Sequence, residues 1–508
     1  MTGVSAALHT PYIWPHVWLI LLPLLAALVS TGLNRSRTHF PALLPWGQGL
    51  LLLCWNALTL WLWLGGVEGG VNETTTRITF APLVGPTLVW TLLTDGPALI
   101  MALLTTWIGT ATLVHTGLRP DAASRPSAPA AFWPLAWLLM ATLNLIWLGA
   151  DLLTLYIGVE ALGLLAVAMI GLNNTPGAVD AALRYLFATL LGSLAYLVGA
   201  GLLFGHYGTL ELATLAGQVS ANGATAAGFG LMLAGLALKA AVFPLHGWLP
   251  AAHASALLPV SVLHAALVIK ASVFVMLRHW LAFGPAFADT ALPLLVGALG
   301  AVAILWGSIM ALQQTRLKLL IAWSTIAQTG YLLVGFPLLL QGDAALQQLV
   351  LQGILYQMVA HGLAKAALFM TAGHLVTATG SDRIDQLTGT GRHLPLTLLT
   401  LGLAGVSLMG MPPSAGFVAK WLLASGAIGS GQVIWLVVLL AGGLLSATYI
   451  LRLLRQAFRE GPEQDVFQHP SRVEKMTAFL LALMTLLLGL MAIPLLSLIT
   501  LPGGGIAP

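Results

Sequence analysis

Residues 238–278 read LKAAVFPLHGWLPAAHASALLPVSVLHAALVIKASVFVMLR, and this stretch decides the fold. An apolar helix is expected up to Lys239, Pro244 interrupts it, and a second apolar helix holds His264 and Lys270. A charged side chain near the bilayer centre costs about 2.5 to 3.5 kcal/mol on insertion scales, and a broken helix leaves backbone groups that need protein or water as partners. The stretch therefore predicts a polar pathway inside a membrane.

The composition of the whole chain agrees with a membrane location. The 508 residues are 58% hydrophobic and only 7% charged, with a mean hydropathy of +0.93, which excludes a soluble globular protein. About fourteen apolar segments are long enough to span roughly 30 Å of hydrocarbon. The first, residues 16–33, follows no basic region and no cleavage site, so we do not expect a removable signal peptide. The predicted fold is an all-α polytopic membrane protein.

The positions of the 20 lysines and arginines predict the orientation of the chain. If both termini face the exterior, only Arg77 and Arg278 fall on the exterior side, and four lysines fall within spans. The other fourteen lie on the cytoplasmic side, as the positive-inside rule requires: Arg35, Arg37, Arg119, Arg125, Arg184, Arg316, Lys318, Arg383, Arg392, Arg452, Arg455, Arg459, Arg472 and Lys475. The net charge of +4 therefore reflects topology, and no nucleic-acid partner is expected.

The sequence has no motif for a cofactor. Cys54 is the single cysteine, so neither a disulfide framework nor an iron–sulfur cluster is expected, and there is no CxxCH haem motif. No GxGxxG or GxxxxGK[ST] motif is present either. We expect no cofactor and no metal in this chain. If it serves a redox enzyme, the electrons travel through other chains.

The order of the spans predicts an internal repeat. Residues 1–130 hold three spans, residues 131–280 and 281–458 hold five each, and residues 459–508 hold a charged loop and a last span. Pro244 and the Pro412 and Pro413 pair interrupt the fourth span of each five-span block, and each interrupted span carries one lysine. Paired interruptions in two halves are typical of internally repeated transporters. Because each block has an odd number of spans, the two repeats must be inverted in the membrane.

Glu160 is the one acid that the span count places well inside a helix. Its helical neighbours are apolar, so it needs a partner from another helix, and Lys239 is the expected one. Asp151, at the start of the same span, is expected to cap the helix. A lysine removed from water releases its proton readily. Making and breaking a contact between Glu160 and Lys239 would therefore move a proton.

Further titratable residues follow along the chain, and three histidines fit as relays because histidine titrates near neutral pH. Lys365 lies one helical turn after His361, and Lys420 lies beside the second break. For Lys318, next to Arg316, anchoring and gating both stay open. The predicted proton path comprises Glu160, Lys239, Lys270, Lys365 and Lys420, with His246, His264, His361 and Lys318 as relays. We expect His253, His279 and His374 to be hydrogen-bonded to neighbouring carbonyls.

These motifs resemble the antiporter-like membrane subunits shared by respiratory complex I, multisubunit cation/proton antiporters and membrane-bound hydrogenase complexes. The resemblance runs from about residue 143 to 454 and rests on the Glu160 helix and on PLHGWLPAAH, PVSVLHAALVIK, LKLLIAWSTIAQTGY, HGLAKAALF and GMPPSAGFVAKW. It implies fourteen helices with two inverted five-helix repeats, each with a half-channel. By resemblance Glu160 and Lys239 are the coupling pair, and Lys420 is the terminal proton site.

The sequence departs from that family at several positions. Val159, Ala251 and Trp323 stand where the family usually has Trp, Asp and Tyr, and Gln357 stands where some members have a second histidine. Gln357 puts one relay step in doubt. Trp421 after the lysine, and no long lateral helix after the last span, favour the N-type or D-type subunit over the L-type.

The predicted function is proton movement, in one interpretation exchanged for Na+, by a subunit of a multisubunit complex in the bacterial cytoplasmic membrane. One alternative is the membrane arm of an NADH-quinone oxidoreductase or hydrogenase, with redox centres in partner chains. Another is an energising subunit that drives uptake by a soluble partner, for example of inorganic carbon. A mere scaffold is disfavoured by the cost of five intramembrane charges. The direction of flow and the driving reaction stay open.

Overall fold

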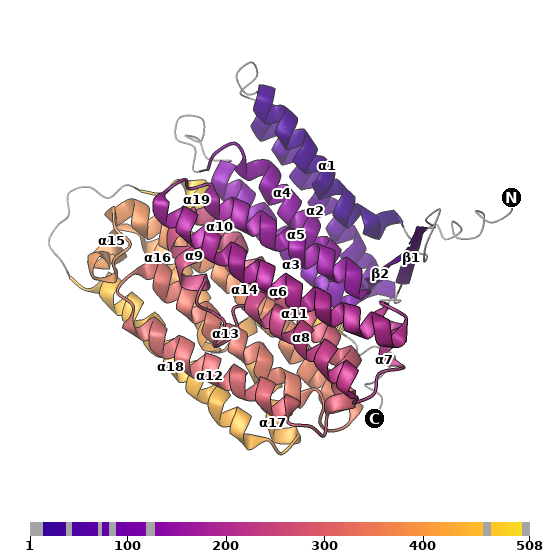
Figure 1. Ribbon diagram of the computed structural model, residues 1–508. Helices are drawn as coiled ribbons and strands as arrows, with labels where there is room; N and C mark the ends of the chain where they lie inside the picture. Colours follow the sequence, from indigo (N-terminus) through magenta and orange to yellow (C-terminus); the bar gives the residue numbers. More distant parts are fainter. Residues whose placement is uncertain are drawn as a thin grey trace.

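The structure is a computed structural model that describes residues 14–36, 43–69, 74–80, 88–117, 128–460 and 469–499. Within these residues the chain is a bundle of long helices that run nearly side by side (Figure 1). Arg37, Arg119 and Arg125, which the orientation argument used, lie outside the described residues. So do the two ends of the chain.

Three long helices and a β-hairpin make up the N-terminal part: α1 (Trp14–Ser36), α2 (Leu43–Gly69), β1 (Thr74–Phe80), β2 (Leu88–Thr94) and α3 (Gly96–Gly117). The strands are antiparallel, with Thr74 opposite Thr94 and Phe80 opposite Leu88. Hydropathy alone predicts that the third span starts at residue 88, and this start is wrong, because residues 88–94 form β2. Residues 88–94 read LVWTLLT, and such β-branched and aromatic residues fit a strand once a partner strand is available.

The next five passages follow without interruption in the described chain. They are α4 (Phe132–Leu148), α5 (Leu152–Gly171), α6 (Pro176–Tyr207), the pair α8 (Gly223–Lys239) and α9 (Leu249–Ser255), and a final helix in three parts, α10 (Leu258–Leu263), η1 (His264–Val268) and α11 (Ile269–Phe283). The short α7 (Leu212–Ala216) lies between α6 and α8. The η1 segment is a π-helix.

The second block repeats this order. Its passages are α12 (Leu292–Gln313), α13 (Leu317–Leu338), α14 (Ala344–Thr379), the pair α16 (Pro395–Met409) and α17 (Ala415–Gly429), and α18 (Val433–Phe458). Short elements connect or follow them: η2 (Gly284–Phe287), η3 (Ile384–Leu387), α15 (Thr390–His393), and α20 (Ile493–Leu496) after the last long helix, α19 (Arg472–Leu490).

Fourteen passages can be traced in the described residues. Eleven helices are long and apolar enough to cross a membrane. The other three passages are α4, the α8 and α9 pair, and the α16 and α17 pair. Five passages in each block mean that the second block starts from the opposite side of the membrane. The predicted fold, with two inverted five-helix repeats and two broken helices, is confirmed.

The local sequence explains where helices start and stop. Asp151 precedes α5 and accepts hydrogen bonds from the backbone N–H groups of Thr154, at 2.7 Å, and Thr91, at 2.9 Å. Its predicted role as a helix cap is confirmed. Proline cannot donate a backbone hydrogen bond, and the chain leaves the α-helical path around Pro244 and Pro413, whose preceding peptide bonds are cis.

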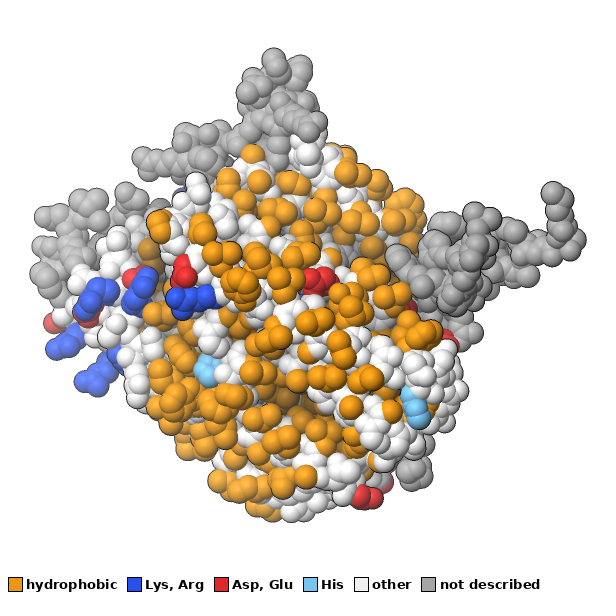
Figure 2. Space-filling model, viewed as in Figure 1, with side chains coloured by type: hydrophobic (Ala, Val, Ile, Leu, Met, Phe, Trp, Pro, Cys, Tyr) orange, Lys and Arg blue, Asp and Glu red, His pale blue; other side chains and the backbone are white. Residues whose placement is uncertain are grey.

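Burial separates an inner layer of helices from an outer one. The membrane-crossing windows of α10 to α11, α13 and α14 are almost fully buried, whereas only about a third or less of those of α1, α2, α18 and α19 is buried. Figure 1 shows α1 and α2 along one side of the bundle and α12, α17 and α18 along the opposite side. Figure 2 shows apolar side chains over most of one face, with Lys and Arg side chains gathered at one end. Lys270 and Lys365 lie on helices of the inner layer, and Lys239 and Lys420 are buried side chains of α8 and α17.

Candidate functional site

The first break places Lys239 between three helices. It is the last residue of α8, and its Nζ donates to Thr189 Oγ1 at 2.7 Å, to the Val159 carbonyl at 3.3 Å and to Glu160 Oε2 at 3.4 Å. The lysine is 4% exposed and Glu160 is 21% exposed. The ion pair expected from the sequence is present. Two hydroxyl-bearing residues of α6, Thr189 and Ser193, complete it, since Ser193 donates to the same Glu160 oxygen.

The turn before Lys270 is a π-helix, and it supplies the lysine with a partner. Residues His264–Val268 form this wider turn, and Lys270 Nζ donates to the Ala265 carbonyl within it. Lys270 is fully buried. His264 lies beside the Ala166 carbonyl of α5, and its Nε2 atom is buried without a hydrogen-bond partner. Single π turns inside α-helices often mark functional positions.

Lys365 and His361 lie one turn apart on α14, deep in the inner layer. Lys365 Nζ donates to the Ile321 carbonyl at 2.7 Å and to Ser324 Oγ, both on α13. Both ring nitrogens of His361 are buried without a hydrogen-bond partner. The two residues are 0% and 1% exposed. A neutral surrounding of this kind gives the lysine hydrogen bonds but no opposite charge.

The second break provides the partners of Lys420. The helix α16 ends at Met409, and Gly410 has a φ of +80°, a conformation that glycine adopts without steric cost. The last carbonyls of a helix have no partner within it. Lys420 Nζ donates to two of them, Leu408 O at 2.7 Å and Met409 O at 3.3 Å. It also lies 4.1 Å from the centre of the Tyr331 ring.

The buried groups form a row rather than isolated sites. His361 lies close enough to Lys270, Lys365 and Lys420 for the charge of each to act on it, and Lys270 acts on Lys365 in the same way. The helices α11, α13, α14 and α17 bring these residues together. The structure thus joins the second repeat's lysines to Lys270 of the first repeat.

Two predicted relay residues lie apart from this row. His246, in the first break, is partly exposed and contacts the rings of Phe243 and Trp323, at centroid distances of 5.4 and 5.3 Å. Lys318 is half-buried at the start of α13 beside the ion pair of Arg316 with Asp382, whose atoms are 2.7 Å apart. Neither donates to a residue of the row in any described contact.

A buried ion pair was missed by the sequence analysis. Arg278 was expected on the exterior side, just past the end of a span, but it lies within α11, so the predicted end of that span is wrong. Its guanidinium binds Asp95 through two hydrogen bonds of 2.5 and 2.9 Å, and the two side chains are 10% and 7% exposed. The span was ended at the charged Arg278, but the helix continues after this arginine to Phe283. From the sequence, Asp95 just before α3 indicates only a helix cap. It has this role as well, since the Ala98 N–H donates to its carboxylate at 2.8 Å.

The histidines outside the row follow the expectation only in part. His279 donates to or accepts from Tyr196 at 2.9 Å and bonds the Val275 carbonyl at 2.7 Å, as predicted. His374 does not rely on a carbonyl. Its Nε2 lies 3.1 Å from Nε2 of His115 on α3, a pairing between distant helices that no local pattern indicates.

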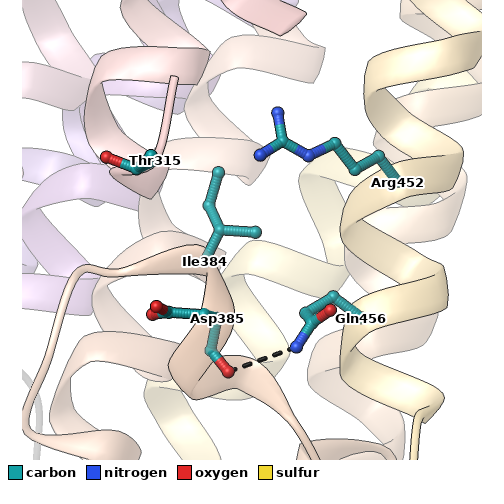
Figure 3. A pocket seen from close by; sticks show the side chains of 5 residues that line it. All are labelled: Thr315, Ile384, Asp385, Arg452 and Gln456. Carbon is teal, nitrogen blue, oxygen red and sulfur yellow. Dashed lines mark hydrogen bonds between the residues drawn. The ribbon is translucent and has the colours of Figure 1, made fainter. Parts of the chain in front are cut away.

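Two pockets lie near the ends of the helices. One, of about 260 Å³, is lined by the β-hairpin, α7 and α11, with Arg278 and Glu211 among its residues. Figure 3 shows the other, of about 120 Å³, between η3 and α18, where Gln456 donates to the Asp385 carbonyl at 3.2 Å. The exposed Asp385 is bound by the Arg383 guanidinium, which lowers the pKa of that carboxyl. No lysine of the row lines either pocket. Among the described residues, no three His, Cys, Asp or Glu side chains gather as metal ligands.

The comparisons with known proteins agree with this geometry. Residues 149–446 match a family model described as NADH:quinone oxidoreductase/Mrp antiporter, TM. A relative, NADH-quinone oxidoreductase subunit N of Desulforudis audaxviator (strain MP104C), is 31% identical over 461 residues, covering 88% of this chain and 87% of that protein.

Two solved structures have the same fold. A chain in the Mrp complex from Dietzia sp. DQ12-45-1b is 22% identical, with a TM-score of 0.81 and coverage of 96% of each chain. A chain in respiratory complex I from Thermus thermophilus with bound NADH is 24% identical, with a TM-score of 0.81 and coverage of 95% of this chain and 98% of that one. At these identities the likeness concerns the fold.

Proposed function

The chain belongs to the NADH:quinone oxidoreductase/Mrp antiporter family of membrane subunits, and from this premise we propose that it moves protons across the membrane along its buried row of lysines. The path runs from Glu160 and Lys239 through Lys270 and Lys365 to Lys420. His264 and His361 relay protons within it, and His246 and Lys318 serve at its ends. Each five-helix block, residues 131–280 and 281–458, supplies one half-channel. Residues 1–130 and 459–508 hold the flanking helices.

One observation carries the proposal. Lys270, Lys365 and Lys420 are buried, and their hydrogen-bond partners among the described residues are carbonyls and a hydroxyl, with no carboxylate. Charges at such depth are rare in membrane proteins and mark pathways for ions or protons. A lysine that lacks an anionic partner in a low-dielectric site changes protonation state easily. Three such lysines in electrostatic contact suit stepwise proton transfer.

The pair at the first break suits the control of that transfer. At about 4 Å and an effective dielectric constant near 20, an opposite charge favours the charged lysine by about 4 kcal/mol. Separation of Glu160 from Lys239 would remove this stabilisation, and Thr189 would remain as a neutral partner. The lysine would then release its proton toward the next member of the row.

The family also supports a setting for the chain. The relative from Desulforudis audaxviator is a subunit of NADH-quinone oxidoreductase, so we infer that this chain works within a multisubunit complex with other membrane subunits. The bacterial cytoplasmic membrane is the proposed location, with both termini at the exterior. The gathering of Lys and Arg at one end supports that orientation (Figure 2). Exchange of protons for Na+ remains a variant of the same proposal.

The test uses the complex isolated through the tagged chain and reconstituted in vesicles. A potassium diffusion potential drives protons, and a trapped pH-sensitive dye reports them. We expect Glu160→Gln and Lys239→Ala to abolish proton movement without loss of assembly, because each removes one charge of the coupling pair. Asp180→Asn is the matched control, since this acid is 61% exposed on α6 and pairs with Arg184. Proton movement that survives both substitutions would refute the proposed path.

A further inference from the structure

The step from Lys365 to Lys420 lacks a titratable side chain in direct hydrogen-bond contact. His361 has no hydrogen-bond partner at either ring nitrogen. Gln357, one turn earlier on α14, donates to Gln328 Oε1 at 2.9 Å. A carboxamide neither gains nor loses a proton near neutral pH. The amide pair can therefore position other groups, but it cannot itself carry a proton.

A chain of hydroxyl groups lies beside this amide pair. Ser324 accepts a hydrogen bond from Lys365. Tyr449, fully buried on α18, lies beside Ser324 and Gln328. It donates to Ser446 Oγ at 3.0 Å. Three hydroxyls from α13 and α18 thus continue from the Lys365 ammonium group.

The far end of the chain points to Lys420. Gln328 Nε2 lies 3.4 Å from Ser446 Oγ and 3.3 Å from the Leu408 carbonyl. Lys420 Nζ donates to that same carbonyl at 2.7 Å. Gln328 and Lys420 therefore share one acceptor, and Ser446 lies on the other side of the Gln328 amide. A single water molecule is the natural bridge for the last step, since bridging waters are nearly as favourable as direct hydrogen bonds.

On this geometry we propose that Tyr449, together with Ser324 and Ser446, passes the proton between Lys365 and Lys420. The inference rests on the proposed proton-conducting function. Charged Lys365 gives a proton to Ser324 Oγ as Ser324 gives its own to Tyr449. Tyr449 then gives its proton to Ser446, and Ser446 protonates the neutral Lys420 amine through water. One proton enters and one leaves each hydroxyl, so only the two lysines change charge.

The first test removes single hydroxyls in the reconstituted complex. Proton relays of this kind contribute about 10²-fold to 10⁴-fold to rates, so Tyr449→Phe and Ser446→Ala should slow proton movement by about tenfold or more. Ser446→Thr, which restores a hydroxyl, should recover much of the loss. Tyr356→Phe is the matched control, because this buried tyrosine of α14 donates to the Leu488 carbonyl instead. A wild-type rate in Tyr449→Phe would overturn the inference.

A second measurement separates a relay from a structural hydroxyl. Replacement of Tyr449 by a fluorinated tyrosine keeps its shape and hydroxyl but makes the phenol more acidic. A relay predicts a changed dependence of proton movement on pH, and an unchanged profile would argue against it even if Tyr449→Phe failed to assemble. If Lys239→Ala stops proton movement while all Tyr449 variants conduct normally, only this inference fails. If Lys239→Ala also conducts, the proposed function fails.

Discussion

The lysines in the bilayer are held mainly by backbone carbonyls that irregular helix geometry leaves free. Lys270 uses a carbonyl of a π turn, and Lys420 uses the last carbonyls of α16. Lys239 ends α8, where the helix dipole favours a positive charge. The partners of Lys270 and Lys420 are dipoles rather than anions, so they stabilise the ammonium group and still allow it to lose a proton. Asp95 and Arg278 show the contrasting case of a permanent ion pair.

The Asp95 and Arg278 pair should contribute to stability rather than to proton transfer. Asp95→Asn keeps the cap of α3 but leaves the Arg278 guanidinium buried without an opposite charge. Loss of one member of a buried pair costs about 3 to 5 kcal/mol, so the thermal unfolding midpoint in detergent should fall clearly. Asp385→Asn is the control, because its pair with Arg383 is exposed on both sides. Equal midpoints for the two variants would contradict the structural assignment.

At the scale of helices, the breaks and the close contacts together position the row. Helices α6 and α8 approach so closely that a Cβ atom at Gly192 would lie 2.7 Å from the Gly235 carbonyl. This contact lies one turn before Lys239 on α8. It brings the lysine to Thr189 on α6. The two glycines therefore position Lys239 by allowing α6 and α8 to approach closely.

A larger residue at the contact between Gly192 and Gly235 should impair the Lys239 site without touching the lysine itself. Gly235→Val would push α8 away from α6, since a Cβ atom at Gly235 would clash with the backbone of Gly192. We expect proton movement to fall by about tenfold or more, because small displacements of a reacting group can reduce rates about 10²-fold. Gly230→Val, on the same helix with nothing within 4 Å of the added atom, should retain activity. Similar rates in both variants would show that the close approach is not needed.

For the whole molecule, the question is which complex contains it. The described surface is largely apolar and is covered by lipid or by neighbouring membrane subunits (Figure 2). The lysine row crosses the interior from one repeat to the other, so a partner that moves either end could drive the protons. The chain itself has one cysteine and no GxGxxG or GxxxxGK[ST] motif.

Isolation of the tagged chain in mild detergent should therefore yield other hydrophobic subunits. Flavin or iron–sulfur absorbance in the preparation would identify the membrane arm of a redox enzyme. Colourless small membrane partners would indicate a cation/proton antiporter, and one large soluble partner would favour energised uptake. Recovery of the chain alone, from membranes solubilised gently enough to keep known complexes intact, would contradict the proposed multisubunit setting.

Local patterns in the sequence determined the spans, the two breaks and the pairing of Glu160 with Lys239. Hydropathy, proline positions and the cost of a charge in lipid act on each segment separately, so they can be evaluated without coordinates. The same reasoning placed Lys270, Lys365 and Lys420 inside spans. Errors arose at segment ends, at the β-hairpin and at Arg278, where a partner from elsewhere in the chain changes which conformation or exposure is favourable.

Only the tertiary structure decided which polar groups meet. Tyr449 and Ser446 follow Ser324 by more than a hundred residues, and His115 meets His374 across the bundle. A serine or tyrosine in an apolar helix has no local periodicity that points to its partner, because the hydrogen bond depends on how distant helices pack. The sequence by itself therefore determined the membrane architecture and the charged members of the row, and helix packing decided the neutral groups that connect them.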